Sequence, residues 1–243
     1  MNRSTHNQPR PSEVDRLKRV YRGYAGHAAG KWSRENVGNL AMLAERYRVI
    51  EEMLAAAAML PLGGTRILDV GCGTGQLLAR FAELGAHPDA LYGVDLMPDR
   101  IEAARATLSE AHFDVGNAEA MDFADEQFDL VVLSTVLSSI LDDRMRRNVV
   151  AEVMRVTAQR GAVLIYDFRV PSPTNRQVRA LSRRDLGRLF AGWHLQARSL
   201  TVVPPVARRL GRATERMYGW LAAMPFLRTH NMVLLRRTLQ QPA

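Results

Sequence analysis

The stretch ILDVGCGTGQLLARF, from Ile67 to Phe81, decides the fold of this chain. It places three glycines at alternate positions between a run typical of a β-strand and a run typical of a helix. Glycines in such a turn allow tight backbone geometry and close approach of a ligand, and the free amides at the start of the helix can bind that ligand. The stretch therefore predicts an α/β fold with a ligand site at this turn.

Two common nucleotide-binding patterns do not fit the turn. A P-loop places Gly-Lys-Ser/Thr after its first glycine and four further residues, but Gln76 lies five positions after Gly71 and no lysine follows it. The dinucleotide pattern G-x-G-x-x-G requires its third glycine at the same position, 76. The turn is therefore a poor match to both patterns.

The pattern acid-x-G-x-G-x-G, formed by Asp69, Gly71, Gly73 and Gly75, resembles motif I of class I S-adenosylmethionine (AdoMet)-dependent methyltransferases. The resemblance extends from Arg66 to Phe168. It implies AdoMet as the methyl donor, S-adenosylhomocysteine as the product, and Cys72 as part of the cofactor turn. AdoMet carries a cationic α-amino group, and Asp69 is suited to bind that end.

Further cofactor contacts are expected after the next strands. Asp95 follows Gly75 by 20 residues, where a carboxylate can accept hydrogen bonds from both ribose hydroxyls, a feature shared with NAD enzymes. The resemblance places Leu96 beside the adenine. Asn117 stands where the family normally has an aspartate, and its carbonyl oxygen can accept the bond from the adenine amino group, while the amide of Ala118 remains available to a ring nitrogen.

The remaining candidate residues flank this core. The resemblance places Ser134 at the methionine end of the cofactor, and Tyr21, Tyr24 and Trp32 precede the core where a lid could contact it. Asp167, at the carboxyl end of the fifth predicted strand, is the candidate catalytic residue, with capping of a loop as the alternative. Histidines and acids show no clustered ligand spacing, so no metal is expected.

Seven aliphatic or β-branched runs predict strands, and helical patterns separate the first five. The runs are RILDV, ALYGVDL, HFDVG, FDLVVLS, AVLIYDF, WHLQARSLTVV and HNMVLLRR. This alternation favours a parallel sheet with helices on both faces. Together with the resemblance it predicts a Rossmann-like, doubly wound, mostly parallel seven-stranded sheet whose last strand is antiparallel.

The organisation around this sheet follows from composition. We expect a disordered tail over residues 1–12, an N-terminal helical cap or lid over 13–64, the AdoMet-binding core over 65–170, and over 171–243 a C-terminal part of the same domain. A basic helical insertion, 203–228, precedes the last strand. The glycine-rich segment 23–36 is predicted to be a mobile loop between two N-terminal helices.

Charge and cysteine content limit the setting of the protein. The 243 residues carry a formal charge of +8, and from Arg176 to Arg237 there are 13 arginines against Asp185 and Glu215. Arginines and an apolar stripe in the insertion could rest on an anionic membrane, or the stripe could pack on the domain. A single cysteine, no apolar run that would cross a bilayer and no secretory h-region favour the cytoplasm.

The acceptor class is narrowed by missing motifs. The segment from Ser134 to Leu137 lacks the Pro-Pro-aromatic motif of enzymes that methylate exocyclic amino groups, and Cys72 is the only thiol, which excludes cytosine C5 chemistry. Nucleic acid is disfavoured because the arginines are not interleaved with aromatic residues. We expect methyl transfer to an O or N atom of a small molecule, a natural product or glycan precursor. An RNA or protein methyltransferase and a nucleotide-binding oxidoreductase are the alternatives.

Overall fold

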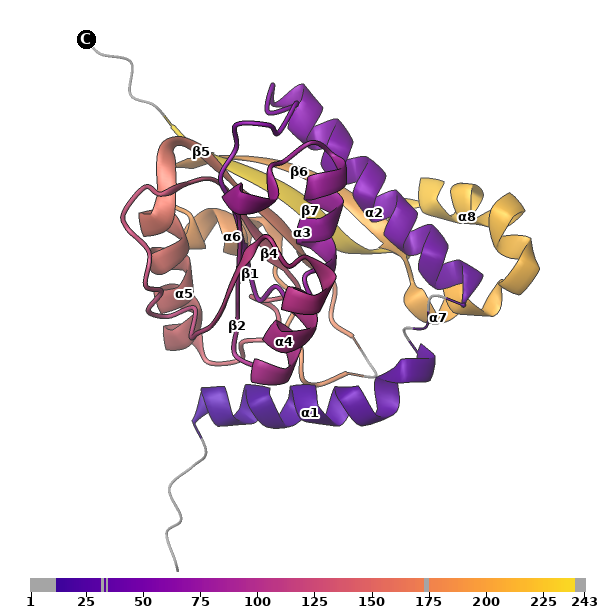
Figure 1. The fold of residues 1–243 in the computed structure, drawn as a ribbon. Coiled ribbons are helices and arrows are strands. Elements are labelled where there is room, and N and C mark those ends of the chain that lie inside the picture. The colour runs from indigo at the N-terminus through magenta and orange to yellow at the C-terminus, as the bar shows by residue number, and fades with distance from the viewer. Residues whose placement is uncertain (1–11, 32, 34, 173–174, 239–243) are drawn as a thin grey trace, which may run out of the picture.

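The protein folds around one seven-stranded sheet (Figure 1). The computed structural model describes residues 12–31, 33, 35–172 and 175–238. The strands are β1 (Ile67–Val70), β2 (Leu91–Asp95), β3 (His112–Val115), β4 (Phe128–Ser134), β5 (Thr157–Phe168), β6 (Trp193–Val202) and β7 (Arg228–Arg237). Their order is β3-β2-β1-β4-β5-β7-β6, and β7 runs antiparallel to β5 and β6. The predicted sheet is confirmed.

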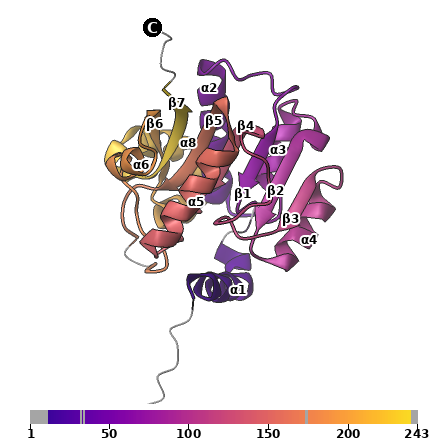
Figure 2. The same cartoon turned by 90° about the vertical axis from the view of Figure 1, so that its left-hand side faces the viewer.

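Helices cover both faces of the sheet, as the buried central strands require (Figure 2). One hydrophobic core joins the sheet to α2 (Val37–Ala56), α3 (Gln76–Glu83) and α4 (Pro98–Thr107). A second core joins the other face to α5 (Asp143–Val156) and α6 (Arg183–Leu189). Every residue of β1 is buried, so the strand holds its carboxyl end rigidly between the two layers.

The N-terminal region contains the two expected helices, but the loop predicted between them is too long. Helix α1 (Glu13–Lys31) includes residues 23–31 of the glycine-rich segment, so that part of the prediction was wrong. Alanine is the best helix former, and the alanines of this stretch offset the cost of its glycines. Ser12 caps α1, because its Oγ accepts a hydrogen bond from the Asp15 amide at 3.1 Å. The rest of the predicted tail, residues 1–11, lies outside the described residues.

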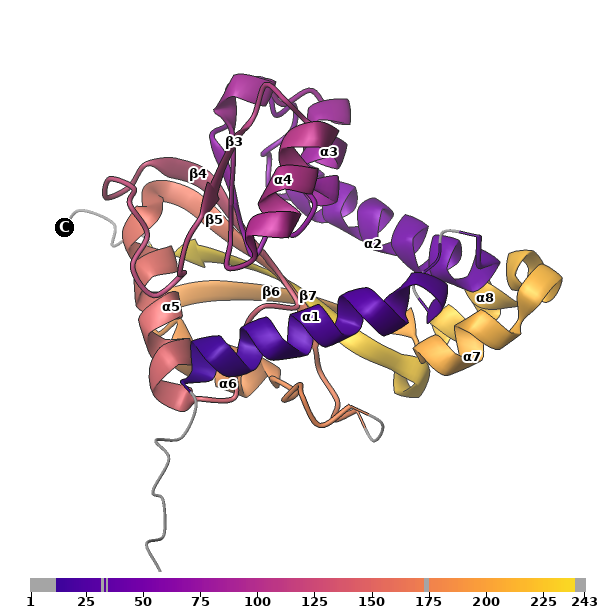
Figure 3. The same cartoon turned by 60° about the horizontal axis from the view of Figure 1, so that its bottom comes forward.

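The helical insertion predicted before the last strand is present. It consists of α7 (Pro204–Arg209), η2 (Gly211–Ala213), α8 (Thr214–Ala223) and η3 (Pro225–Leu227). Helices α7 and α8 lie beside α2, at the opposite end of the molecule from α5 (Figures 1 and 3). A Cβ atom at Gly38 of α2 would lie 2.1 Å from the Ala207 carbonyl oxygen, so this contact requires glycine. Within the described residues no helix is both long and apolar enough to span a membrane.

Candidate functional site

The glycine turn after β1 is fixed by the neighbouring strand. The amides of Gly71 and Cys72 donate to the Val94 carbonyl oxygen at 2.7 and 3.1 Å. Gly71 has a φ of +74°, and a Cβ atom there would lie 2.7 Å from a methyl carbon of Val136. A side chain at this position would therefore strain the backbone and collide with the segment after β4.

Asp95 ends β2 and joins the glycine turn to the start of α4. Its Oδ2 accepts a hydrogen bond from the Gly73 amide at 3.0 Å, and its Oδ1 accepts one from the Met97 amide at 2.9 Å. The residue is 8% exposed. A carboxylate has about four acceptor positions, so both oxygens can still accept hydrogen bonds from a ligand.

A cavity lies outside the carboxyl ends of β1, β2 and β4, the place where open α/β sheets bind ligands. Predicted cofactor residues from four separate segments line it together, namely Gly71, Asp95, Leu96, Asn117, Ala118 and Ser134. Met97 and Gly116 complete the wall at β2 and β3, and Val149 contributes from α5. The chain thus assembles six of the twelve predicted cofactor residues around one cavity.

Asn117 is oriented by its own turn. Its Oδ1 accepts from the Glu119 amide at 3.1 Å, and its Nδ2 donates to the Glu119 carboxylate at 3.2 Å. Glu119 also accepts from Asn148 of α5 at 2.9 Å. The Asn117 carbonyl oxygen keeps a second lone pair for a donor such as an amino group.

Asp69 lies on β1 next to the cavity but is not part of its wall. The side chain is 2% exposed, and its Oδ1 has no hydrogen-bond partner among the described residues. Burial raises the pKa of Asp69 to about 7, and the positive charge of Arg46 on α2 opposes this rise. A buried carboxylate oxygen without a donor is suited to bind the cationic amino group of the expected cofactor.

The other predicted cofactor residues hold the turn or lie further away. Gly73 and Gly75 shape the turn through their backbone, and the Cys72 thiol is buried in the hydrophobic core, where burial raises its pKa. The Tyr24 hydroxyl donates to Asn175 at 3.3 Å and does not line the cavity. Trp32 lies outside the described residues.

Asp167 lies near the carboxyl end of β5, as expected, but both of its carboxylate oxygens already accept hydrogen bonds. Oδ2 accepts from the Ser138 amide and Oδ1 from the Phe168 amide, each at 2.9 Å. Burial raises the pKa of Asp167 to about 6, against the lowering effect of these hydrogen bonds. The carboxylate therefore anchors the segment after β4, which lines the cavity.

Helix α1 covers the cavity, and of the three residues considered for a lid Tyr21 is the described one that lines it. Leu17, Lys18 and Tyr21 line the cavity from α1. The Tyr21 hydroxyl shares a hydrogen bond of 3.0 Å with the Ser139 hydroxyl, and the Arg100 guanidinium lies 4.6 Å from the Tyr21 ring centroid. Tyr21 thus links α1 to both sides of the cavity.

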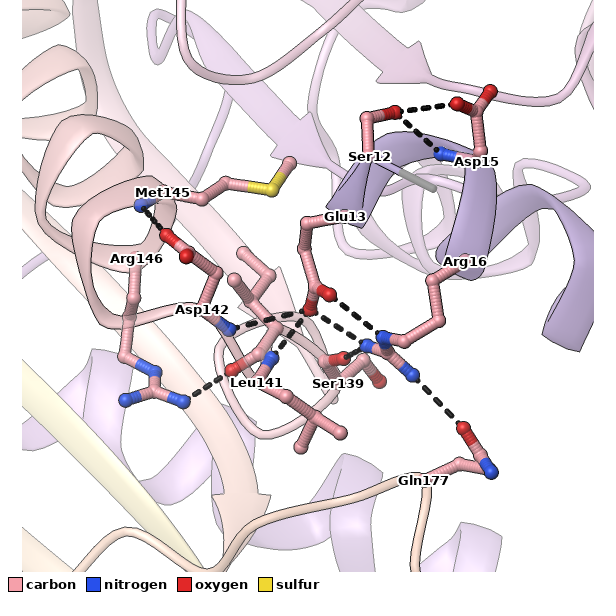
Figure 4. Close-up of polar contacts among 11 residues, drawn as sticks. Ser12, Glu13, Asp15, Arg16, Ser139, Leu141, Asp142, Met145, Arg146 and Gln177 are labelled. Atoms are coloured by element: carbon pink, nitrogen blue, oxygen red, sulfur yellow. Dashed lines mark hydrogen bonds and ion pairs between the residues drawn. The ribbon is translucent and has the colours of Figure 1, made fainter. Parts of the chain in front are cut away.

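The start of α1 is held by a separate polar cluster (Figure 4). Glu13 accepts from the Leu141 amide at 2.6 Å and from the Asp142 amide at 3.3 Å. Arg16 pairs with Glu13 at 2.7 Å and donates to Gln177 at 2.9 Å. In the sequence, Glu13 and Arg16 have the spacing of an ordinary solvent-exposed helical ion pair. The pattern therefore could not reveal that Glu13 binds the segment at Leu141.

Neither metal nor histidine chemistry is evident in the part of the chain that the structure describes. It contains no group of three or more His, Cys, Asp or Glu side chains placed to hold a metal ion. His230 is stacked on Tyr166 with ring centroids 4.7 Å apart, and burial lowers the pKa of His230 to about 3. The imidazole is therefore neutral near pH 7.

Comparison with known proteins agrees with this geometry. A family model described as a methyltransferase domain matches residues 67–161. The 2-phytyl-1,4-naphtoquinone methyltransferase of Trichormus variabilis is 30% identical over 161 residues, which are 64% of this chain and 62% of that protein. The ubiquinone biosynthesis O-methyltransferase of Azorhizobium caulinodans is 38% identical over 36% of this chain and 35% of its own length. The chain thus aligns with less than two thirds of either relative.

Solved structures share the whole fold at low sequence identity. A Burkholderia thailandensis 1,6-didemethyltoxoflavin-N1-methyltransferase, with its substrate and S-adenosylhomocysteine bound, has a TM-score of 0.64 at 16% identity and covers 96% of this chain and 93% of its own. The [4+2]-cyclase SpnF has a TM-score of 0.66 at 18% identity, covering 96% of this chain and 99% of its own. These likenesses concern the fold alone.

Proposed function

We propose that the chain, whose residues 67–161 match a methyltransferase domain, is a class I AdoMet-dependent methyltransferase that transfers the methyl group of AdoMet to a small molecule. The acceptor atom is an oxygen or a nitrogen of a natural product or glycan precursor. When bound, AdoMet supplies an electrophilic methyl group on a sulfonium. The protein's part is to hold the donor and acceptor in line and to exclude water.

The observation that carries the proposal is the position of Asp95. This carboxylate borders the cavity, and the amides of Gly73 and Met97 fix both of its oxygens. A carboxylate in that position suits a pair of ribose hydroxyls, and Leu96 and Asn117 lie on the same wall for an adenine ring.

The residues present fit the rest of the cofactor. The unpartnered Oδ1 of Asp69 suits the α-amino group, and the glycine turn offers space where a side chain would collide. Gln76 stands where the dinucleotide pattern requires its third glycine. This donor set favours an amino acid nucleoside over a dinucleotide.

The acceptor side of the site rests on fewer observations. We assign to Asp167 a role toward the acceptor, either directly or through the segment that it anchors at Ser138. Tyr24 and Trp32 stay proposals as contacts at the mouth of the site. Relatives carry names that specify quinone or toxoflavin acceptors, which supports a small cyclic acceptor here and disfavours RNA and protein.

Product analysis tests the proposal. Purified protein is incubated with AdoMet labelled in its methyl group and with pools of hydroxylated or nitrogen-containing ring compounds, and methylated products are identified by mass spectrometry. We expect methyl transfer that the Asp95→Ala variant loses. Fragmentation distinguishes O- and N-methyl products from the C-methyl products named for UbiE relatives. Absence of transfer together with NADH binding would favour the oxidoreductase instead.

A further inference from the structure

We propose that the outer side of the helical insertion docks on an anionic lipid membrane. The docking side, here called the insertion surface, consists of the exposed side chains of Arg209, Arg212, Arg216, Met217, Trp220 and Phe226. It belongs to α7, η2, α8 and η3, which lie at the edge of the molecule beyond α2 (Figures 1 and 3). The proposal does not depend on methyl transfer.

Large apolar side chains are exposed mainly in the helical insertion that carries this surface. Among the described residues, seven large hydrophobic side chains are exposed, and five of them lie between Val206 and Phe226. Trp220 is 77% exposed and Phe226 is 78% exposed. Aromatic side chains concentrated in one exposed segment mark an interaction site, and tryptophan favours the boundary between lipid and water.

Positive charge surrounds these aromatic residues. Residues 203–228 contain five arginines and Glu215 as the only acid. Arg216 precedes Trp220 by four residues on α8, so the two side chains are neighbours on one helix face. Each arginine near an anionic membrane contributes about 1 kcal/mol. An apolar surface bordered by arginines is complementary to anionic lipid and not to a neutral apolar partner.

The inner side of the insertion is already occupied by packing. Thr214 and Tyr218 of α8 are buried, and the Tyr218 hydroxyl donates to Glu45 of α2 at 2.7 Å. Met42 of α2, Val202 and Ala207 join Tyr218 in this small core. One side of the insertion therefore packs on the domain. Trp220 lies on the other side and is exposed to solvent.

Vesicle binding by the full chain tests the proposal. Binding is measured by sedimentation with phosphatidylcholine vesicles that contain or lack phosphatidylglycerol, together with a blue shift of tryptophan emission. We expect binding only to the anionic vesicles, weakened by salt. The Arg209→Gln, Arg212→Gln, Arg216→Gln triple variant should bind about 100-fold more weakly, at about 1 kcal/mol for each arginine.

Matched variants separate this surface from net charge. Replacing Arg144, Arg147 and Arg160, which are exposed on α5 and β5, by glutamine removes the same charge and should leave binding within about threefold of wild type. Trp220→Ala should weaken binding about tenfold and abolish the blue shift, while Val115→Ala on β3 should change neither. Unchanged S-adenosylhomocysteine binding and thermal midpoint would verify that each variant is folded.

Three results would overturn the proposal. They are equal binding to neutral vesicles, equal losses in the two triple variants, and wild-type binding by Trp220→Ala. A dimer in light scattering that Trp220→Ala dissociates, without vesicle binding, would assign the surface to a second copy of the chain instead.

Discussion

At the scale of single residues, Asp95 has the most direct consequence for cofactor binding. Asp95→Ala removes charge-assisted hydrogen bonds worth about 1.5 to 3 kcal/mol each, so the affinity for S-adenosylhomocysteine should fall at least about tenfold. Isothermal calorimetry measures this change. Asp114→Ala, which removes an exposed carboxylate from the neighbouring strand β3, serves as the control and should bind as wild type. Unchanged affinity in Asp95→Ala would refute the ribose assignment.

The proposed contact of Asp69 with the amino group of the cofactor should make cofactor affinity depend on pH. Its pKa is raised to about 7 by burial, so the carboxyl is largely protonated at pH 6 and ionised at pH 8. The cationic amino group binds the ionised form, and affinity for S-adenosylhomocysteine should therefore fall by about tenfold for each pH unit below the pKa. Calorimetry from pH 6 to 8 should show this slope in the wild type and lose it in Asp69→Asn. Parallel pH profiles would contradict the assignment.

The same group should limit stability at alkaline pH. A carboxyl whose folded pKa is raised stabilises the fold in its neutral form below the unfolded pKa of about 3.8, and this contribution is lost as pH rises through the folded pKa of about 7. Asp69→Asn keeps the side chain neutral, so at pH 8 it should raise the free energy of unfolding by up to about 4 kcal/mol. The thermal midpoint should rise accordingly. Binding and stability would thus change in opposite directions. A lower midpoint in Asp69→Asn at pH 8 would disprove the buried-charge penalty.

The Asp167→Asn variant distinguishes a chemical role of this carboxylate from a structural one. Asp167→Asn can accept one backbone hydrogen bond but places an NH2 group against the other amide, so stability should fall by about 1 to 3 kcal/mol. If the carboxylate acts on the acceptor, turnover falls as well while cofactor affinity is kept. The readouts are kcat, cofactor affinity and the thermal midpoint. Wild-type turnover would restrict Asp167 to anchoring the segment at Ser138.

At the scale of elements, α1 is held over the cavity by polar contacts of Glu13, Arg16 and Tyr21. Burial alone would raise the pKa of Glu13, but hydrogen bonds from Arg16 and from the amides of Leu141 and Asp142 lower it. A depressed pKa means that this contact stabilises the closed helix above pH 4.5 and is lost as pH falls through the folded value. Tyr21 provides the second attachment, at Ser139.

Loosening α1 should speed cofactor release. Removing the Glu13 carboxylate and the Tyr21 hydroxyl together, in Glu13→Ala, Tyr21→Phe, leaves the amides of Leu141 and Asp142 without that acceptor. Each lost hydrogen bond costs about 1 kcal/mol, so the dissociation rate of S-adenosylhomocysteine should rise about tenfold or more. Stopped-flow displacement measures the rate. Glu52→Ala, which breaks the exposed pairs with Arg48 and Arg198, is the control, and an unchanged rate in the double variant would show that α1 does not retain the cofactor.

The spacing of apolar residues predicted the strands and most helices well, because the apolar residues of each element are the ones that it buries. The sequences of β1, β4 and β7 are rich in aliphatic and β-branched residues, and the strands lie where they were expected. The extension of α1 through residues 23–31 was missed, since glycine content favoured a loop while neighbouring alanines favoured helix. Contacts across the chain were beyond reach, because the bonds from Glu13 to Leu141 and from Tyr21 to Ser139 join residues more than a hundred positions apart.

At the scale of the whole molecule, motif spacing predicts the residues that follow the parallel strands, but it does not predict how the outer helices pack over them. The glycine turn and Asp95 lie at fixed distances from strands, so their place beside the cavity could be predicted from the sequence, whereas their contacts with a cofactor stay predictions. The wall that α1 adds to the cavity depends on tertiary packing, and such packing leaves no short motif in the sequence. The substrate therefore has to be found by experiment, whereas the donor can be tested at once.

Ligand-linked stability provides that test for the entire fold. A ligand that binds only the folded protein adds about 2.7 kcal/mol of stability at 100 times its Kd, which for a domain of this length corresponds to a rise in the thermal midpoint of about 5 to 10 °C. S-adenosylhomocysteine should produce this rise, and NADH at the same concentration should produce none, because position 76 is a glutamine where the dinucleotide pattern requires a glycine. In Asp95→Ala the same concentration should give a smaller rise, since the site is then less saturated. A rise with NADH and none with S-adenosylhomocysteine would mean that the cavity holds a redox cofactor, and the methyl-transfer proposal would have to be abandoned although the fold is unchanged.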